Sequence, residues 1–201
     1  MISLSKKLEN KKMLRRYFLE RRGSLAEDYR SNADKAVCDR LISLEFIRSK
    51  GVVAAYMSDG TEPDLGVFLE HCLAEKIKIF LPRFDFSGET GGYEMVEITN
   101  LKSQLKEGKY GLLEPLAELK AVKEESLLDI NWLVPGVAFD DAGGRLGRGK
   151  GVYDRLLSGK GHKVGIFYDC QKYEAVPMEG HDRKLDMIVT ESKVYRFGKM
   201  E

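Results

Sequence analysis

Glycines alternate with cationic side chains along residues 143–151, which read GGRLGRGKG. An apolar run over residues 130–139 precedes this segment and ends at Asp140 and Asp141, and VYDRLL over residues 152–157 follows with the pattern of a first helical turn. Glycine lets a ligand approach the backbone closely, while backbone N–H groups, Arg and Lys side chains and a helix N-terminus attract anions. The order of strand, cationic glycine loop and helix therefore predicts a phosphate-binding loop.

The spacing of Gly144, Gly149 and Lys150 matches the G-x-x-x-x-G-K pattern of a well-known nucleotide-binding loop. The next residue in that pattern is Ser or Thr, whose hydroxyl binds magnesium, whereas here it is Gly151. A magnesium ion would therefore need an oxygen ligand from elsewhere, and Asp154 lies four residues after the lysine. The alternative is a surface loop in which the glycines turn the chain and water solvates the cations.

Residues 5–22, SKKLENKKMLRRYFLERR, have the periodicity of an amphipathic basic helix. Lys7, Lys11 and Arg15 recur every four residues and therefore share one face of it. Such a face is usually solvated. The alternative is that Lys11 and Arg15 neutralise phosphate.

Short apolar runs alternate with amphipathic segments along the rest of the chain, which is typical of strands and helices in a βαβ arrangement. Strands are predicted over residues 52–57, 77–81, 93–98, 130–139, 163–168, 185–190 and 194–197. Helices are predicted over 24–48, with Ser24 and Glu27 forming a capping box, from Pro63 onward, and over 101–108. We therefore predict one α/β domain, a Rossmann-like, mainly parallel sheet with helices on both faces, similar to the sheets of sugar-phosphate isomerases and CoA-transferases.

Two acids outside the cationic loop could also serve a site. Glu62 stands at the carboxyl end of a predicted central strand, where open α/β sheets bind ligands, although it also suits the first turn of a helix. Asp182 stands in a turn-rich segment, where an acid commonly accepts a local hydrogen bond. Cationic loop, acids and basic helix together are typical of phosphoryl transfer, in which the protein mainly positions groups and neutralises charge. Asp154 and Asp182 would then hold magnesium.

The composition limits the classes of function. At 201 residues the chain has the length of one domain, and its formal net charge of +1 argues against a nucleic-acid binder, because such domains usually carry a basic excess. No apolar run reaches the roughly 20 residues of a membrane-spanning helix. The three cysteines are scattered and form no C-x-x-C pair, which is typical of reduced thiols in the cytosol. We therefore expect a cytoplasmic protein that contacts neither nucleic acid nor membrane.

A longer stretch, VPGVAFDDAGGRLGRGKGVYDRLL over residues 134–157, closely resembles the signature of the 5-formyltetrahydrofolate cyclo-ligase family, also called 5,10-methenyltetrahydrofolate synthetases. Other segments follow the family's order along the chain: KKMLR at 11–15, YMSDGTEPD at 56–64, LPRF at 81–84, YGLLEP at 110–115 and VPMEGHDRKLDMIVTE at 176–191. The resemblance implies a ligase that uses ATP and Mg²⁺ to convert 5-formyltetrahydrofolate to 5,10-methenyltetrahydrofolate, with release of ADP and phosphate. We expect a monomer that accepts the folate with or without a polyglutamate tail.

The resemblance also implies roles for individual residues. Those expected to bind ATP are Lys11, Arg15, Arg145, Leu146, Gly147, Arg148, Gly149, Lys150, Gly151, Val152 and Tyr153. Those expected to lie against the folate are Met57, Glu62, Tyr110, Arg148, Gly149, Lys150, Gly151 and Tyr153. Asp154 and Asp182 are expected to hold Mg²⁺, with Asp186 as a weaker candidate. Arg145, Arg148 and Lys150 are expected to be catalytic, because they would neutralise the charge of the phosphates.

Two positions depart from the family pattern. Val152 stands where the family commonly has Tyr, in GKGYYD, and Tyr110 stands where some members have Trp. If the missing Tyr ring stacks on the ligand, folate affinity is lower in this protein. If that ring only packs within the protein, affinity is unchanged.

Without the resemblance, the residues leave two other functions open. A sugar-phosphate isomerase or CoA-transferase-like enzyme would need phosphate sites but would not hydrolyse ATP. A non-enzymatic nucleic-acid binder would use the basic helix over residues 5–22, and its binding would depend steeply on salt concentration.

Overall fold

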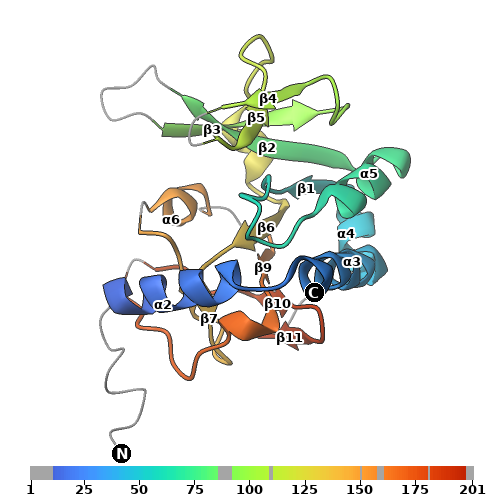
Figure 1. Cartoon of the computed structure of the whole chain (residues 1–201). Coiled ribbons are helices and arrows are strands. Elements are labelled where there is room, and N and C mark those ends of the chain that lie inside the picture. Colours follow the sequence, from blue (N-terminus) through green and yellow to red (C-terminus); the bar gives the residue numbers. More distant parts are fainter. Residues whose placement is uncertain are drawn as a thin grey trace, which may run out of the picture.

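A computed structural model describes residues 11–85, 92–108, 111–149, 151–157, 161–180 and 182–197, except for the side chains of Glu124, Asp154 and Arg155. Seven strands form one sheet in the order β11-β10-β9-β6-β1-β2-β3 (Figure 1). Their bounds are β1 Val52–Ala54, β2 Lys78–Asp85, β3 Gly92–Ile98, β6 Asn131–Pro135, β9 Lys163–Ile166, β10 Met187–Val189 and β11 Val194–Arg196. The strands from β10 to β2 run parallel, and β3 and β11 are antiparallel edges. The predicted mainly parallel sheet is confirmed.

Helices lie on both faces of the sheet (Figure 1). They are α3 (Glu27–Ser43), α4 (Glu45–Lys50) and α5 (Gly66–Ala74) on one face and α6 (Val152–Leu156) on the other. Because successive side chains of a strand point to opposite faces, Val53 and Leu133 pack with the first group, whereas Ala54 and Trp132 pack in the cluster that includes Leu157. In the described part of the chain, no helix combines the length and apolar character that a membrane crossing requires.

The strand order places a crevice at the centre of the sheet. From β1 the chain continues through α5 to β2 on one side, whereas from β6 it continues to β9 and β10 on the other side. The segments that follow β1 and β6 therefore diverge from each other. Open α/β sheets bind ligands in the crevice that such a divergence leaves at the carboxyl ends of the strands.

Two small sheets and one helix complete the crevice. β7 (Ala138–Phe139) pairs with β8 (Arg145–Leu146), and β4 (Leu105–Glu107) pairs with β5 (Leu113–Pro115), both in antiparallel fashion. The N-terminal helix α2 (Lys11–Gly23) packs on the β7–β8 hairpin, where Leu14 and Phe18 share a core cluster with Val137, Ala138 and Leu146. This packing brings the predicted basic helix beside the glycine-rich segment that follows β8.

The predicted second helix differs from the structure at its start and in its middle. The helix expected over 24–48 is two helices, because the extended backbone of Leu44 (φ −81°, ψ 107°) separates α3 from α4. The expected capping box is absent, since Ala26 is the N-cap residue of α3 and Ser24 Oγ instead donates to the Arg21 carbonyl. Here local hydrogen bonding to the preceding helix outweighs the sequence signature of a cap.

Two other predicted elements also differ. The segment over 101–108 is a turn followed by β4 instead of a helix, because Asn100 Oδ1 accepts the N–H groups of Lys102 and Ser103. The helix expected from Pro63 begins at Gly66. In both places a short polar turn occupies residues that the sequence pattern assigned to a helix.

The apolar run over 130–139 is not one strand. β6 ends at Pro135 and β7 begins at Ala138, with Gly136 between them. A Cβ at Gly136 would lie 2.7 Å from the ring of Phe167, so this close approach requires glycine. The predicted cationic loop accordingly begins as the hairpin strand β8, and the helix after it, α6, has only five residues.

Candidate active site

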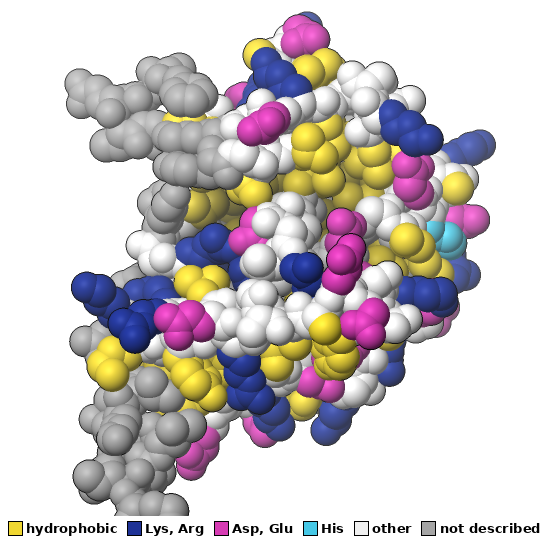
Figure 2. Space-filling view, in the orientation of Figure 1, with side chains coloured by type: hydrophobic (Ala, Val, Ile, Leu, Met, Phe, Trp, Pro, Cys, Tyr) yellow, Lys and Arg dark blue, Asp and Glu magenta, His cyan; other side chains and the backbone are white. Residues whose placement is uncertain are grey.

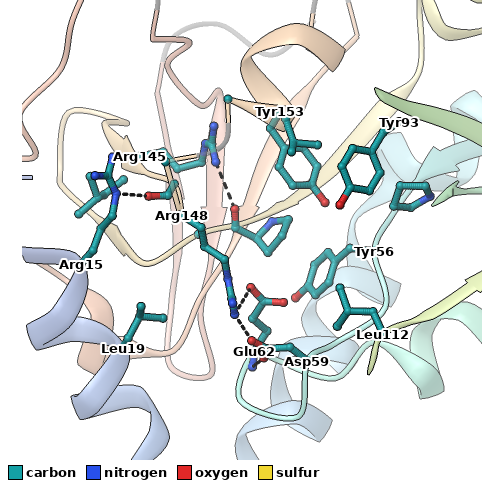
Figure 3. A pocket seen from close by; sticks show the side chains of 18 of the residues that line it. Arg15, Leu19, Tyr56, Asp59, Glu62, Tyr93, Leu112, Arg145, Arg148 and Tyr153 are labelled. Carbon is teal, nitrogen blue, oxygen red and sulfur yellow. Dashed lines mark hydrogen bonds and ion pairs between the residues drawn. The ribbon is translucent and has the colours of Figure 1, made fainter. Parts of the chain in front are cut away.

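A cavity of about 670 Å³ opens at the carboxyl ends of β1 and β6. The residues that line it are Lys11, Arg15, Leu19, Tyr56, Met57, Asp59, Glu62, Pro82, Tyr93, Leu112, Leu113, Glu114, Pro135, Gly136, Arg145, Leu146, Gly147, Arg148, Gly149, Gly151, Val152, Tyr153 and Asp182. Cationic, acidic and hydrophobic side chains gather around this hollow above α2 (Figure 2). Figure 3 shows Arg15 and Arg145 on one side, which we name the cationic end, and Tyr56, Tyr93 and Tyr153 on the other, the aromatic end.

Helix α2 presents one row of side chains to the cavity. Lys11, Arg15 and Leu19 are spaced four residues apart and all line the cavity, as a single helix face requires. The Arg15 Nε donates to the Gly147 carbonyl oxygen at 2.8 Å. The helix face that could have been solvated is therefore turned toward the glycine-rich segment.

The glycines of this segment make room for arginine side chains. A Cβ at Gly147 would lie 3.1 Å from Arg145 Nη1, and a Cβ at Gly149 would lie 3.2 Å from Arg15 Cζ. Gly149 also has φ +89°, in the left-handed region that favours glycine. The two guanidinium groups can thus pack directly on the loop backbone and concentrate positive charge at the cationic end.

Asp140 has a structural role instead of a chemical one. Its buried carboxylate accepts the N–H groups of Ala142 and Gly144 through Oδ1 and that of Val176 through Oδ2. A Cβ at Gly144 would lie 2.6 Å from Asp140 Oδ2, so glycine is required in this turn. Gly144 therefore closes the β7–β8 hairpin and does not line the cavity, although its spacing matches a nucleotide-binding loop.

At the aromatic end Tyr56 is buried, and Tyr93 and Tyr153 are partly buried. The Tyr56 hydroxyl donates to the Pro63 carbonyl at 2.9 Å, and the Tyr153 ring lies 5.6 Å from Arg145 Cζ, within cation–π range. Burial raises the pKa of both tyrosines, so both stay neutral at physiological pH. Their rings, with that of Tyr93, gather at this end of the cavity, where a planar ligand could lie against them (Figure 3).

Glu62 lies between the two ends, in a cluster of two carboxylates and two guanidinium groups. Its Oε1 is 3.3 Å from Arg148 Nη2 and 3.5 Å from Arg22 Nη1. Arg148 also pairs with Asp59, as does Arg22. Burial raises the pKa of Glu62 and Arg22 lowers it, while burial and the neighbouring Arg22 lower the pKa of Arg148.

Lys11 pairs with two acids at the cationic end. Its Nζ lies 2.7 Å from Glu179 Oε1 and 2.9 Å from Asp182 Oδ2, and the hydrogen bonds to these acids raise the pKa of Lys11 against the opposing effect of burial. Asp182 lines the cavity, with its side chain 15% exposed. Among the described side chains, no group of three or more His, Cys, Asp or Glu residues could hold a metal ion. Because Mg²⁺ is usually bound by one or two carboxylates plus phosphate oxygens and water, Asp182 fits as a protein ligand.

Comparison with known proteins adds to this geometry. A sequence model described as the 5-formyltetrahydrofolate cyclo-ligase family matches residues 7–191. The chain belongs to this family. It is 30% identical to the 5-formyltetrahydrofolate cyclo-ligase of Escherichia coli K12, over 89% of this chain and 98% of that protein. It is 29% identical to the 5-formyltetrahydrofolate cyclo-ligase of Mycolicibacterium smegmatis, over 90% of this chain and 93% of that protein.

Solved structures of two cyclo-ligase relatives have the same fold as this chain. The 5,10-methenyltetrahydrofolate synthetase of Aquifex aeolicus is 35% identical and superposes with a TM-score of 0.81, over 95% of this chain and 94% of that one. The synthetase of Mycoplasma pneumoniae is 23% identical, with a TM-score of 0.69 over 90% and 99%, and it shows the fold alone. The predicted family and fold class are confirmed.

Most residues for which the cyclo-ligase resemblance predicts a role line the one cavity. They are Lys11, Arg15, Met57, Glu62, Arg145, Leu146, Gly147, Arg148, Gly149, Gly151, Val152, Tyr153 and Asp182. Lys150 and Tyr110 lie outside the described residues, as does the side chain of Asp154. Val152, where the family commonly has Tyr, lines the cavity, so a ring at this position could reach a ligand. The individual roles stay predictions.

The weaker metal candidate, Asp186, lies elsewhere. Its Oδ2 accepts the N–H of Lys163 at 2.8 Å, at the amino end of β9 and thus at the opposite edge of the sheet. The sequence prediction also missed Tyr56, Asp59 and Tyr93, which line the cavity. Asp59 could have been found, because it lies in the segment 56–64 that the family shares. Tyr93 could not, since a hairpin strand brings it in from the sheet edge.

Proposed function

We propose that this protein catalyses the ATP-dependent ring closure of 5-formyltetrahydrofolate to 5,10-methenyltetrahydrofolate, with release of ADP and phosphate. Family membership supports the choice of reaction. The observation that carries the proposal is that one cavity joins a cationic end, suited to phosphates, to an aromatic end with a buried carboxylate, suited to a pterin. Both substrates could then lie end to end with the reacting groups between them.

The chemistry explains why both ends are needed. The formyl oxygen attacks the γ-phosphorus of ATP, the bond to ADP breaks, and the formyl carbon on N5 is activated as a phosphorylated iminium group. N10 attacks that carbon, the carbon–oxygen bond breaks to release phosphate, and N10 loses its proton. The protein must align two substrates and neutralise the transferring phosphoryl group, which requires little covalent chemistry of its own.

The cationic end would bind the triphosphate. Arg145 and Arg15 are held against glycine backbone, so their positive charge is already in place before ATP arrives. Lys11 would exchange its pairing with acids for a phosphate contact. Arg148, which contacts Glu62 between the two ends, would neutralise the γ-phosphate as it is transferred, and the family resemblance predicts the same role for Lys150.

The aromatic end would bind the folate. Glu62, when ionised, could accept two N–H groups of the pterin ring in a bidentate manner. Tyr153 would lie against the folate rings, together with Met57, which lines the cavity on the segment after β1. The family resemblance predicts that Tyr110 also contacts the folate. The folate formyl group would then point toward the cationic end.

Mg²⁺ would be held by Asp182 and Asp154 together with phosphate oxygens. When bound, the ion would add positive charge to the triphosphate and favour transfer of its terminal group. Asp182 would have to give up its contact with Lys11 to serve as a ligand. Once Asp182 had left Lys11 for the metal ion, the Lys11 ammonium group would be available to bind ATP.

The test is an absorbance assay for 5,10-methenyltetrahydrofolate with purified protein, 5-formyltetrahydrofolate and Mg²⁺, with and without ATP. We expect product only with ATP and one ADP released for each product molecule. Product formed without ATP, or ADP released without the folate, would contradict the proposal. A sugar-phosphate isomerase or CoA-transferase-like enzyme would release no ADP in response to the folate.

A further inference from the structure

Arg22 is a fully buried cation that lies behind the cavity and does not line it. Its Nη1 donates to the Gly136 carbonyl at 3.1 Å and lies 3.5 Å from Glu62 Oε1. Its Nη2 donates to Thr61 Oγ1 at 2.8 Å and to Asp59 Oδ2 at 3.3 Å. One guanidinium group thus connects the last turn of α2, the end of β6 and the segment after β1.

Stability alone does not explain an arginine at this position. The attraction within a buried ion pair commonly only offsets the cost of removing both charges from water, so apolar residues of similar volume are often at least as stabilising. The partners of Arg22 are instead the acids beside the cavity, Glu62 and Asp59. A buried carboxylate that has to stay ionised needs a permanent cation nearby.

Arg148 cannot supply that permanent charge. It approaches Glu62 from the cavity side, its side chain is 46% exposed, and it belongs to the segment that would bind phosphate. A phosphate in the cavity would draw Arg148 away from Glu62. Arg22, whose side chain is 0% exposed, has no route to the cavity and keeps its contact.

We propose that Arg22 is the positioning residue of the folate subsite. It holds the Glu62 carboxylate in place, ionised and directed at the pterin, when Arg148 moves from Glu62 to a bound phosphate. This inference rests on the proposed function, because it takes Glu62 as the group that binds the pterin. Arg22 itself touches neither substrate.

The inference has a pH consequence. The charged and titratable groups around Glu62 are Arg22 on α2, Arg148 after β8, Tyr153 on α6, and Asp59 and Tyr56 on its own segment. Burial raises the pKa of Glu62, and Arg22 is the group that lowers it. Without Arg22 the pKa rises further, so Glu62 takes up a proton, and folate binding weakens, at a higher pH.

The experiment compares Arg22→Lys, Arg22→Met and the wild type, with Arg21→Ala as a matched control on the exposed side of the same helix turn. The KM values for folate and for ATP, and kcat, are measured over a range of pH, with thermal unfolding as a check on folding. For Arg22→Lys we expect the folate KM to rise about tenfold and the ATP KM to change less than about twofold. For Arg22→Met the rise in folate KM should also begin at a higher pH than in the wild type.

Each outcome is decisive. An inactive wild type would overturn the proposed function and this inference with it. An active wild type with an unchanged folate KM in Arg22→Lys, or with folate and ATP KM raised in the same proportion, would overturn this inference alone. Failure of Arg22→Lys to fold would do the same, because it would make Arg22 a residue of the fold instead of the subsite.

Discussion

Some cations around the cavity pair with acids that a ligand would have to replace, whereas Tyr56 at the aromatic end rests on backbone that no ligand would disturb. Lys11 at the cationic end contacts Asp182, and Arg148 contacts Glu62 between the two ends, and all four residues line the cavity. Tyr56, in contrast, is buried and donates to the Pro63 carbonyl. The first kind of contact is exchanged on binding, and the second is already complete.

A binding site can thus be prepared either by ion pairs that a ligand replaces or by side chains that packing already holds in place. Exchangeable ion pairs keep a cluster of cations compatible with the fold when no phosphate is present, because like charges are offset by nearby acids. Aromatic rings carry no charge and need no such compensation, and a buried ring such as that of Tyr56 is held in place by packing. Binding of the triphosphate should therefore depend on charge, and binding of the folate on shape and on one carboxylate.

The largest effect is expected at the cationic end. Lys150→Ala should lower kcat about 10²- to 10³-fold, because the cation that the family resemblance predicts at the transferring phosphate is lost. Arg145→Lys, which keeps the charge but loses the planar fork, should have a smaller effect in the same direction. Steady-state kinetics check both, with the exposed Lys102→Ala as control. Wild-type turnover in both Lys150→Ala and Arg145→Lys would break the assignment of the cationic end to phosphate.

A second change tests the proposed folate contact of Glu62. Glu62→Gln should raise the folate KM about 10- to 100-fold, because the amide offers one acceptor instead of two and leaves buried donors without partners. The ATP KM should stay close to the wild-type value, and Glu70→Gln, an exposed change, should alter neither. If Glu62→Gln affected ATP more than folate, the two ends would have to be exchanged.

The Mg²⁺ requirement of the enzyme should depend on Asp182. Asp182→Asn should raise the Mg²⁺ concentration needed for half-maximal rate about tenfold, because a charged oxygen ligand becomes neutral. The measurement is a Mg²⁺ titration at saturating ATP and folate. An unaltered titration curve would remove Asp182 from the metal site and leave its pairing with Lys11 as its role.

The folate KM should depend on pH through the ionisation of Glu62. Burial raises the pKa of Glu62 above that of an ordinary glutamate, so the carboxylate is ionised above this pKa and takes up a proton as the pH falls through it. The folate KM should therefore rise as the pH falls, and in Glu62→Gln it should lose this dependence. KM values measured across the pH range check this, and a dependence that survived in Glu62→Gln would assign it to another group.

The smallest effect concerns the position that departs from the family pattern. Val152→Tyr should lower the folate KM about two- to tenfold, because Val152 lines the cavity and a ring there could stack on the ligand. Folate KM values of the variant and the wild type, measured side by side, check this. An equal or higher folate KM in Val152→Tyr would mean that the ring usual in the family packs against protein.

Much of the site could be predicted because its residues are close together in the sequence. The segment from Arg145 to Tyr153 carries its glycines and cations within nine residues, and the spacing of Lys11 and Arg15 already placed them on one helix face. The mainly parallel sheet followed from short apolar runs that alternate with helices. These features depend on local periodicity and side-chain chemistry, which a single sequence displays.

Other features required the folded chain. Nothing in the local pattern places Tyr93 beside Tyr153, or Arg22 behind Glu62, because these pairs meet only when a hairpin edge, a helix end and two strand ends converge. The sequence by itself determined which chemistry is available, since residue type fixes charge, shape and hydrogen-bonding capacity. Only the tertiary structure decided which charges are buried and paired, because burial and pairing depend on distances between segments far apart along the chain.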